Sequence, residues 1–590
     1  MTSIRDEGGT HAVLEAASAL DQGAPGGGLR TWGLASVSAA ALAACGAGTD
    51  TPTTDAQAQP ANVTPATPEQ QQQAVRFLDQ AGLGATTAEV DALTSSQLNF
   101  DAWLDAQFAM PPGRSAWQLA KDLGVDTNPK SIDADTGLDN VLWYRLLKSP
   151  DVLRQRIVLA LSEIFVVSMN NMPIPWGQFA CLAYWDTLEA YCFGTFRELI
   201  ERITLSPAMG VYLSMRGSQK SDADSGRRPD ENYARELMQL FTIGLVELDN
   251  NGQPILVDKD GKKETVDTYS NDDVMQLAKV LTGWDFDVTE APTYNAAKTT
   301  PDYTRLPMKP QADRHDDESA KTFLGLTIPA KAKDAAGDLE KALDHICAHH
   351  NVPFFVSKQL IQRLVMSNPT PEYVLDVAKV FVDNGQGLRG DLKAVIRAIL
   401  KHRMAREALT GNEAVQRCKL REPILRFVQW GRLARLQSID NEWNIGDLSA
   451  ADRLGQSPMR APSVFNFFRP GYVPLNSGVS ADGFVAPEFQ ITDESSVIGY
   501  ANFVLQHLDG AGTQMIAFDY SEWTAIAADA AKLVDRLNLM LTARSLASVT
   551  VDVITAAVRS LPADTSVRLA NRVKAAFYLM LTSPDYMIQR

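Results

Sequence analysis

The chain has 590 residues, of which 45% are hydrophobic and 21% charged, and its formal net charge is −16. This composition can bury a large core, which excludes wholesale disorder, and the length allows two large domains or about four of average size. The acidic balance argues against broad contact with a nucleic-acid backbone, and no apolar run of about 18 residues indicates a polytopic membrane protein.

Residues 1–45 have the layout of an export signal. Arg30 precedes a short, alanine-rich apolar segment, and Leu42-Ala43-Ala44-Cys45 resembles the lipobox at which bacterial lipoproteins are cleaved and acylated. We therefore expect Cys45 to carry a lipid that holds the protein on a membrane, and Gly46 after it favours the outer membrane. Four acidic residues before Arg30 suit a signal poorly, so a disordered alanine-rich tail is the alternative.

Residues 46–70 are rich in Thr, Pro, Ala and Gln and contain almost no large apolar side chain. Such a segment cannot offset the entropy lost on ordering, so we predict a flexible tether. A tether behind an acylated cysteine would hold a globular domain, residues 71–590, in the periplasm or at the cell surface. Four cysteines follow in that domain, and they allow three disulfide pairings but lack the CxxC spacing of a structural zinc site.

From residue 71 onward, apolar residues recur mainly at helical spacing, for example over residues 100–108 and 153–164. Thr86 and Glu89 form a capping-box pattern before an apolar run. Asn-Gly and Asp-Gly pairs flank another short apolar run, which predicts a small β-hairpin insertion near residues 246–269. Strands and helices do not alternate along the chain. We therefore predict a mainly α fold, a single large multi-helix domain with this one hairpin.

The most informative stretch runs from Arg227 to Gly244. Pro229 and Asp230 mark a helix start, and Gly244 marks a helix stop. Within that helix, polar residues recur at i, i+3, i+4 and i+7 on one face: Asn232, Arg235, Glu236 and Gln239. This stripe either lines a cleft, with Glu236 as general base or metal ligand, or forms an ordinary solvated face with an Arg–Glu contact.

Three further groups could carry chemistry, and each has a structural alternative. Glu163 lies in a nearly continuous apolar run, which indicates either a buried ion pair or a functional acid. His315 and Lys321 belong to a polar segment with three acids, which either binds a divalent metal or forms an acidic loop. His345 and His349 have the HxxxH spacing that can chelate zinc, but the catalytic HExxH form is absent and His349 could equally cap a helix.

Motifs of the common enzyme classes are missing. The sequence contains no GxSxG elbow, no P-loop and no GxGxxG. Serine hydrolases of the usual kind, nucleotide-binding proteins and dinucleotide-dependent enzymes are therefore disfavoured.

Several of these stretches resemble the signature of a large bacterial family known as domain of unknown function 1800. The resemblance extends over residues 72–590. Its motifs are ENYARELMQLFTIGL at 231–245, LTGW at 281–284, the segment from His315 to KTFLG at 321–325, KQLIQRL at 358–364, RAPSVFNFFRPGY at 460–472 and APEFQIT at 486–492. Some relatives carry His-Asn-His where this chain has Leu161 to Ile164, and many have Glu in place of Gln239. These two differences from the relatives argue against a conventional metalloenzyme here.

The resemblance implies an exported bacterial envelope protein without an established activity. Relatives are often encoded beside a second family, domain of unknown function 1501, that is similar to alkaline phosphatases and sulfatases, which implies a possible partner of that kind. The cofactor is unknown, and a divalent metal is the one that the side chains would fit. The resemblance also selects candidate site residues, to which we add Glu163: Asn232, Arg235, Glu236, His315 and Lys321.

These candidates allow three interpretations. In a hydrolase of an envelope or extracellular polymer, Glu236 would be the base or a metal ligand and His315 the acid or a ligand. Arg235 and Lys321 would neutralise an anionic intermediate, and Asn232 would orient the substrate. In a binding protein, the same cleft would hold a glycan or a phosphatase-like partner without turnover. In the third interpretation, the motifs form a buried ion-pair network that fixes the helices.

Overall fold

The computed structural model describes residues 65–289, 300–330, 333–407, 411, 413, 417–508 and 515–590. The signal-like segment, Cys45 and tether residues 46–64 lie outside the described residues. Residues 68–590 form one compact unit. Its first helix, α2 (Pro68–Ala81), begins slightly before the boundary that we predict at residue 71. Proline and an acidic residue suit the first turn of a helix, and the apolar side chains of α2 are buried, so this part of the predicted tether is ordered.

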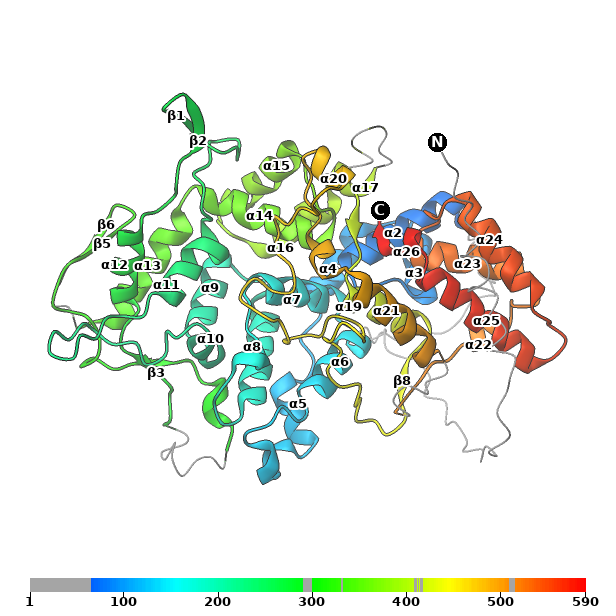
Figure 1. Cartoon of the computed structure of the whole chain (residues 1–590), viewed down its shortest axis with the longest axis horizontal. Helices are drawn as coiled ribbons and strands as arrows, with labels where there is room; N and C mark the ends of the chain where they lie inside the picture. The colour runs from blue at the N-terminus through cyan, green and yellow to red at the C-terminus, as the bar shows by residue number, and fades with distance from the viewer. Residues whose placement is uncertain are drawn as a thin grey trace, which may run out of the picture. The chain divides into compact units, whose positions relative to one another are not determined.

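The described unit is mainly α-helical, which confirms the predicted fold class (Figure 1). The helices of its first half are α3 (Thr87–Ser95), α4 (Phe100–Ala109), α5 (Ala116–Asp122), α6 (Leu138–Lys148), α7 (Val152–Ile164), α8 (Gly177–Tyr191), α9 (Phe196–Thr204), α10 (Pro207–Tyr212), α11 (Asn232–Glu236) and α12 (Asn271–Val280). Those of the second half are α13 (Ala335–Ala348), α14 (Asn351–Leu364), α15 (Pro371–Val382), α16 (Leu392–Lys401), α17 (Arg403–Arg406), α19 (Pro423–Leu433), α20 (Gly478–Ala481), α21 (Glu494–His507), α22 (Ser521–Thr524), α23 (Ala530–Thr542), α24 (Ser548–Ser560), α25 (Ser566–Leu581) and α26 (Pro584–Met587).

Helix α7 is the centre of the core. Every residue of α7 is buried, including Arg154, Arg156 and Glu163. It contacts α2, α4, α6, α8 and α14, helices that come from widely separated parts of the chain. A helix that is buried on all sides must pair its own polar side chains, because water cannot solvate them.

The capping box that the sequence predicts at α3 is confirmed. The backbone N–H of Glu89 donates to the Thr86 hydroxyl, and the backbone N–H of Thr86 donates to the Glu89 carboxylate at 2.9 Å. These two bonds satisfy backbone donors that an uncapped helix would leave free.

The predicted hairpin insertion is also confirmed. Strands β1 (Leu256–Lys259) and β2 (Lys262–Thr265) pair antiparallel, and every residue in both strands is exposed. Asp260 and Gly261 form the turn with φ of 56° and 78°, the left-handed conformations that a tight hairpin turn requires. In Figure 1 the hairpin projects from the helical body.

The remaining strands in the described part of the chain are short antiparallel pairs. They are β3 (Trp284–Asp285) with β4 (Lys309–Pro310), β5 (Lys321–Phe323) with β6 (Leu326–Ile328), β7 (Lys419–Leu420) with β10 (Ile588–Gln589), and β8 (Gln437–Ser438) with β9 (Ile516–Ala517). Each pair is a separate two-stranded sheet, and none of them joins a larger sheet in the described part of the chain.

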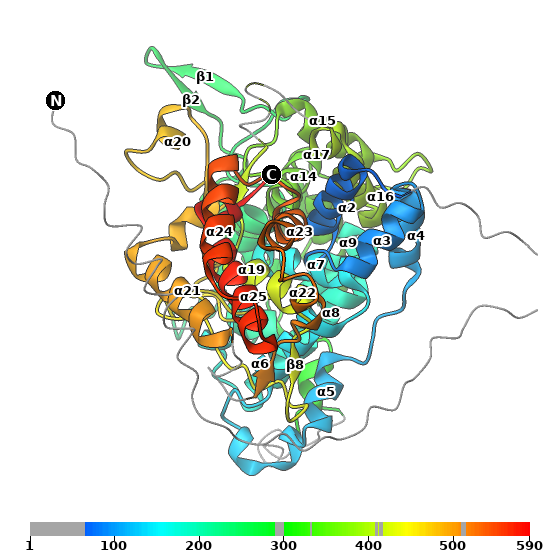
Figure 2. The same ribbon diagram turned by 90° about the vertical axis from the view of Figure 1, so that its right-hand side faces the viewer.

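The C-terminal segment is built into the core. Helices α23, α24 and α25 pack on one another, and α23 also contacts α2 at the start of the unit (Figure 2). Tyr586 is fully buried and its hydroxyl donates to the Gln429 side chain at 3.0 Å. Strand β10 then pairs with β7, and Gln589 donates to the carbonyl of Leu364.

Cys181, Cys192, Cys347 and Cys418 are not joined by disulfides, so none of the three pairings occurs. Within the described ranges, no helix is both long and apolar enough to cross a bilayer.

Candidate functional site

The sequence predicts a regular α-helix for the Arg227–Gly244 motif, but the structure shows an α-helix followed by a π-helix. It begins as α11 and continues from Leu237 to Thr242 as the π-helix η4, whose last residue donates from its hydroxyl to the carbonyl of Leu237 at 2.5 Å. The wider π turn rotates the following side chains relative to an α-helix. Glu236, the last residue of α11, lies in the core and is 7% exposed, whereas Leu240 within the π-helix is only partly buried.

The polar stripe predicted on this helix is consequently divided. Asn232 is exposed, and Arg235 contacts Glu231 at 3.3 Å and the Asn271 side chain at 3.1 Å. Gln239 accepts a hydrogen bond from the Tyr269 hydroxyl. Glu236 has a buried oxygen, Oε2, without a hydrogen-bond partner, and burial raises the pKa of its carboxyl although Arg235 opposes the shift.

His315 and Lys321 do come together, but in the interior. The Asp338 carboxylate lies 2.7 Å from Lys321 Nζ and 3.2 Å from His315 Nε2, and all three side chains are about 1% exposed. The other ring nitrogen of His315 lies 3.0 Å from the carbonyl of Thr282. Both ring nitrogens of His315 thus lie within hydrogen-bonding distance of an oxygen atom.

The LTGW motif holds this cluster in place. Asp316 donates its backbone N–H to the Thr282 hydroxyl at 2.8 Å. Gly283 has φ of 86°, and a Cβ atom there would lie 2.9 Å from the backbone nitrogen of His315. Only glycine permits this conformation and this close approach.

Glu163 belongs to a second buried cluster. Its carboxyl group lies 3.6 Å from Arg363 Nε and accepts a hydrogen bond from Gln456 at 3.4 Å. Burial and the neighbouring Glu422 raise the pKa of Glu163. Burial acts in the same direction on Glu422, but the charge of Lys419 and a hydrogen bond from Glu163 outweigh it and lower the pKa of Glu422 to about 2. Glu163 therefore holds a proton more tightly than Glu422 does.

The structure places the candidate residues in separate groups rather than side by side. Among the described residues, no hydrogen bond or ion pair joins Glu236 to His315, Lys321 or Glu163. His315 and Lys321 are almost completely inaccessible and cannot contact a solute. The physical reason is ion pairing in the interior: Asp338 holds Lys321 and His315, and Arg363 lies beside Glu163, whereas Glu236 is buried without such a partner.

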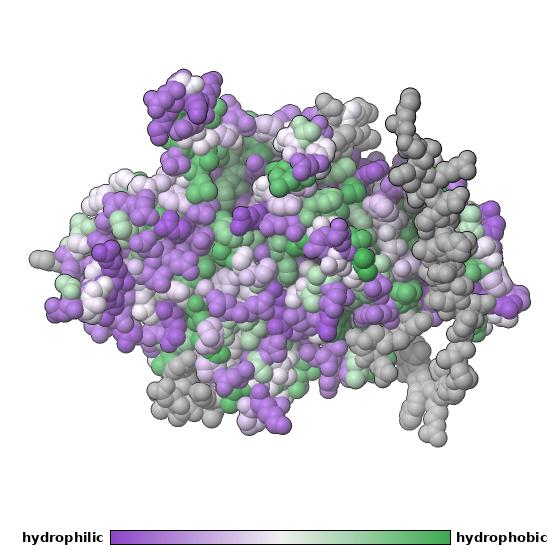
Figure 3. Space-filling model, in the orientation of Figure 1, coloured by the Kyte–Doolittle hydropathy of each residue, from purple (hydrophilic) through white to green (hydrophobic). Residues whose placement is uncertain are grey.

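A pocket of about 450 Å³ opens beside α14. Three of the signature motifs contribute to it, together with the base of the hairpin and the start of α15. Its lining residues include Ile243, Gly244, Leu245, Phe354, Phe355, Lys358, Gln359, Gln362, Pro369, Pro371, Pro470, Gly471 and Val485. Figure 3 shows hydrophobic surface at the base of the hairpin, below its hydrophilic tip.

Most of the polar side chains that line this pocket come from one helix, and Gln253, which precedes the hairpin, is the exception. Phe354, Lys358 and Gln362 are spaced by four residues and so lie on one face of α14, with Gln359 beside them. Lys358 is exposed to solvent, yet partial desolvation by its neighbours lowers the pKa of its ammonium group, and no described acid pairs with it. Gln359 Oε1 is buried without a hydrogen-bond partner, whereas Gln362 donates to the carbonyl of Ser367 at 2.9 Å.

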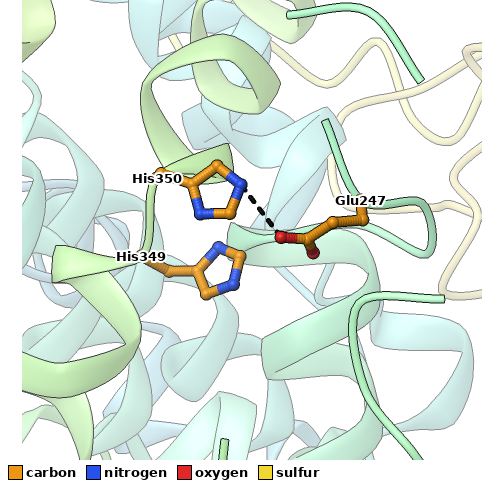
Figure 4. Close-up of side chains that lie close together, drawn as sticks. All are labelled: Glu247, His349 and His350. Atoms are coloured by element: carbon orange, nitrogen blue, oxygen red, sulfur yellow. Dashed lines mark ion pairs between the residues drawn. The ribbon is translucent and has the colours of Figure 1, made fainter. Parts of the chain in front are cut away.

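Possible metal ligands lie at the N-terminal end of the same helix. Glu247, His349 and His350 bring their ligand atoms within 4.8 Å of one another (Figure 4). His350 Nε2 lies 2.9 Å from the Glu247 carboxylate, and His349 Nδ1 accepts the backbone N–H of Asn351 at 3.2 Å. The two imidazole rings are stacked with centroids 4.6 Å apart, so both would have to turn to aim at one ion.

The HxxxH pair is separated. His345 Nε2 bonds to the carbonyl of Leu324 at 2.9 Å, and His349 is the C-terminal cap of α13. Burial, followed by the neighbouring His350 and His345, lowers the pKa of His349 to about 4.

The family model described as "Protein of unknown function (DUF1800)" matches residues 76–588. The chain belongs to this family. Comparison with curated proteins found no match, and comparison with solved structures found none.

Sequence reasoning missed the residues that line the pocket of this DUF1800 chain. Lys358, Gln359 and Gln362 stand in a recognised motif, but their helical spacing with Phe354 was the only signal that they share a face. Glu247 was also missed, because the ligand that joins His349 and His350 lies about a hundred residues earlier in the chain.

Replacing Asp338 tests whether the His315 cluster is structural. Asp338→Asn leaves the buried Lys321 ammonium group without its counter-charge, so we expect the free energy of unfolding to fall by about 3–5 kcal/mol. Denaturant unfolding followed by circular dichroism measures the loss. The control Asp376→Asn, in an exposed pair with Lys379, should change stability by less than about 1 kcal/mol. An Asp338→Asn protein as stable as the parent would contradict this assignment.

The lowered pKa of His349 predicts a pH effect on stability. The unfolded chain binds a proton at this residue near pH 6.5, but the folded chain binds it only near pH 4. Stability should therefore fall as the pH is lowered from about 6.5 towards 4. His349→Gln should make the melting temperature less dependent on pH in that range, and equal slopes for parent and variant would refute the prediction.

Proposed function

We propose that this protein is an exported, lipid-anchored protein of the bacterial envelope that binds an apolar ligand bearing an acidic group. The pocket beside α14 is the proposed binding site. The observation that carries the proposal is the unpaired Lys358 ammonium group at an otherwise largely apolar surface.

The polar groups of the pocket support this ligand class. A carboxylate beside Lys358 would supply the missing counter-charge, and a donor on the ligand would satisfy Gln359 Oε1. Phe354, Phe355 and the prolines would cover the apolar part. Ligand sites commonly combine an apolar lining with a few such polar groups.

Binding is supported better than hydrolysis at this pocket. The acids and bases that a hydrolase would need, His315, Lys321 and Glu163, are held in buried clusters. Glu236 has an elevated pKa and no hydrogen-bonded partner to orient or activate it. Neither arrangement supplies an accessible acid–base pair.

Export and anchoring rest on the sequence of residues 1–45 and on the tether that follows. A protein held in this way meets other exported proteins. The phosphatase- or sulfatase-like partner implied by the family resemblance could present an apolar chain terminus with its carboxylate to the pocket.

Octanoate and 1-octanol provide a matched test of the proposed ligand class. We expect calorimetric titration of the full chain to show tighter binding of octanoate, because only the acid pairs with Lys358. Lys358→Met keeps the apolar stem but removes the charge, so it should reduce the preference for the acid by about tenfold or more. The control Lys379→Met alters an exposed lysine of α15 and should preserve the preference. Equal affinity for acid and alcohol in the parent would refute the proposal.

Metal-dependent hydrolysis is a second candidate function, favoured by the two imidazoles and one carboxylate at the start of α14. A divalent ion held there would act as a Lewis acid. This candidate predicts stoichiometric zinc binding by the full chain, measured by titration calorimetry, that Glu247→Ala and His349→Ala abolish. His345→Gln, which changes a histidine outside the cluster, should retain binding. Absence of stoichiometric zinc in the parent would exclude this candidate.

A further inference from the structure

Three arginines from separate segments gather at the N-terminal end of the helical unit. Arg76 is on α2, Arg406 ends α17, and Arg417 precedes β7. Helix α17 packs against α2. Arg406 donates through Nη2 to the side chain of Gln80, which lies one turn after Arg76 on the same face of α2.

The guanidinium groups are held by apolar and backbone contacts rather than by acids. Arg406 lies over the Phe77 ring, with its central carbon 5.2 Å from the ring centroid. Arg417 donates through Nη1 to the carbonyl of Glu407 at 2.5 Å and is only 6% exposed. These contacts fix the orientation of both side chains but do not neutralise their charges.

Most of the donor atoms in this group have no acceptor. The buried nitrogens without a hydrogen-bond partner are Arg76 Nε, Gln80 Nε2, Arg406 Nε and Nη1, and Arg417 Nε and Nη2. All of them are donors. The Glu163 cluster differs, because it leaves both donors and acceptors unpaired, as in Arg156 and Glu488.

No described carboxylate forms an ion pair with the three arginines. Two acids from the same segments are engaged elsewhere, since Glu413 pairs with Arg403 and Asp79 pairs with Arg421. Burial lowers the pKa of Arg406 to about 9 and that of Arg417 to about 10, and the charge of Arg76 acts in the same direction on both. The cluster therefore contains three cations whose mutual repulsion is not offset.

We propose that Arg76, Arg406 and Arg417 form a binding site for a tetrahedral oxyanion, either inorganic phosphate or the phosphate group of a larger molecule. A guanidinium group presents two parallel N–H donors to the oxygens of such an anion, and a dianion would balance most of the buried charge. Arg76 and Arg406 are only partly buried, which leaves a small anion access to the unpaired donors. The site uses none of the residues that line the α14 pocket, so it stands independently of the proposed function.

Calorimetric titration of the full chain with sodium phosphate at constant ionic strength tests this site. We expect one phosphate per chain, and we expect sodium chloride to produce no comparable heat. Arg76→Gln and Arg406→Gln should each weaken phosphate binding by about tenfold or more, since each removes a charged donor. Arg403→Gln is the matched control on α17, because Arg403 is already paired with Glu372 and Glu413.

Arg76 is the more informative variant, because its partly exposed side chain can be replaced with little effect on folding, which circular dichroism verifies. Glycerol 3-phosphate distinguishes the two sources of the anion. Tighter binding than inorganic phosphate would indicate a phosphate group on a larger molecule, and weaker binding would indicate free phosphate. Failure of the parent to bind either compound, or unchanged affinity in a folded Arg76→Gln protein, would overturn the proposal.

Discussion

Charge that is buried in a helical core must be compensated within that core, and this requirement organises most of the described structure. The cluster around Glu163 shows how. Glu163 comes from α7, Arg363 from α14, Lys419 from β7, and Glu422 from the start of α19, while Glu488 bonds to Lys419 from a fourth distant segment. Lys419 and Glu422 are three residues apart, but the other members are far apart in sequence, so the core cannot form until these four segments meet. Removing one member would leave its partner as an uncompensated buried ion.

The sequence predicts the helical fold class and the hairpin because both follow from local signals. Apolar spacing identifies α7, Thr86 and Glu89 identify the start of α3, and Asp260-Gly261 identifies the hairpin turn. The π-helix could not be predicted in this way. Its turn depends on the packing of Phe241 and on the hydroxyl of Thr242, neither of which alters the helical spacing of the sequence.

The candidate site could be predicted only in part. Sequence patterns singled out the chemically important side chains, but they do not distinguish a carboxylate that faces solvent from one that faces a buried cation. Asp338, which contacts both His315 and Lys321, lies on α13, outside all of the signature motifs. The pocket and the arginine cluster likewise depend on segments that meet only in three dimensions, such as α2 with α17 and α14 with the 470–485 region.

The last residues of the chain determine when the core can be completed during synthesis. Tyr586 and Gln589 fill positions between α14 and α19, and α23 covers the first helix of the unit. During synthesis, the core therefore stays incomplete until residue 589 has emerged. A chain that folds late stays unfolded for longer, and an unfolded chain is what translocation through a membrane channel requires. By the same logic, a cargo domain fused after residue 590 would leave this closure possible, whereas removal of the final six residues would take away the bonds that Tyr586 and Gln589 make to Gln429 and Leu364.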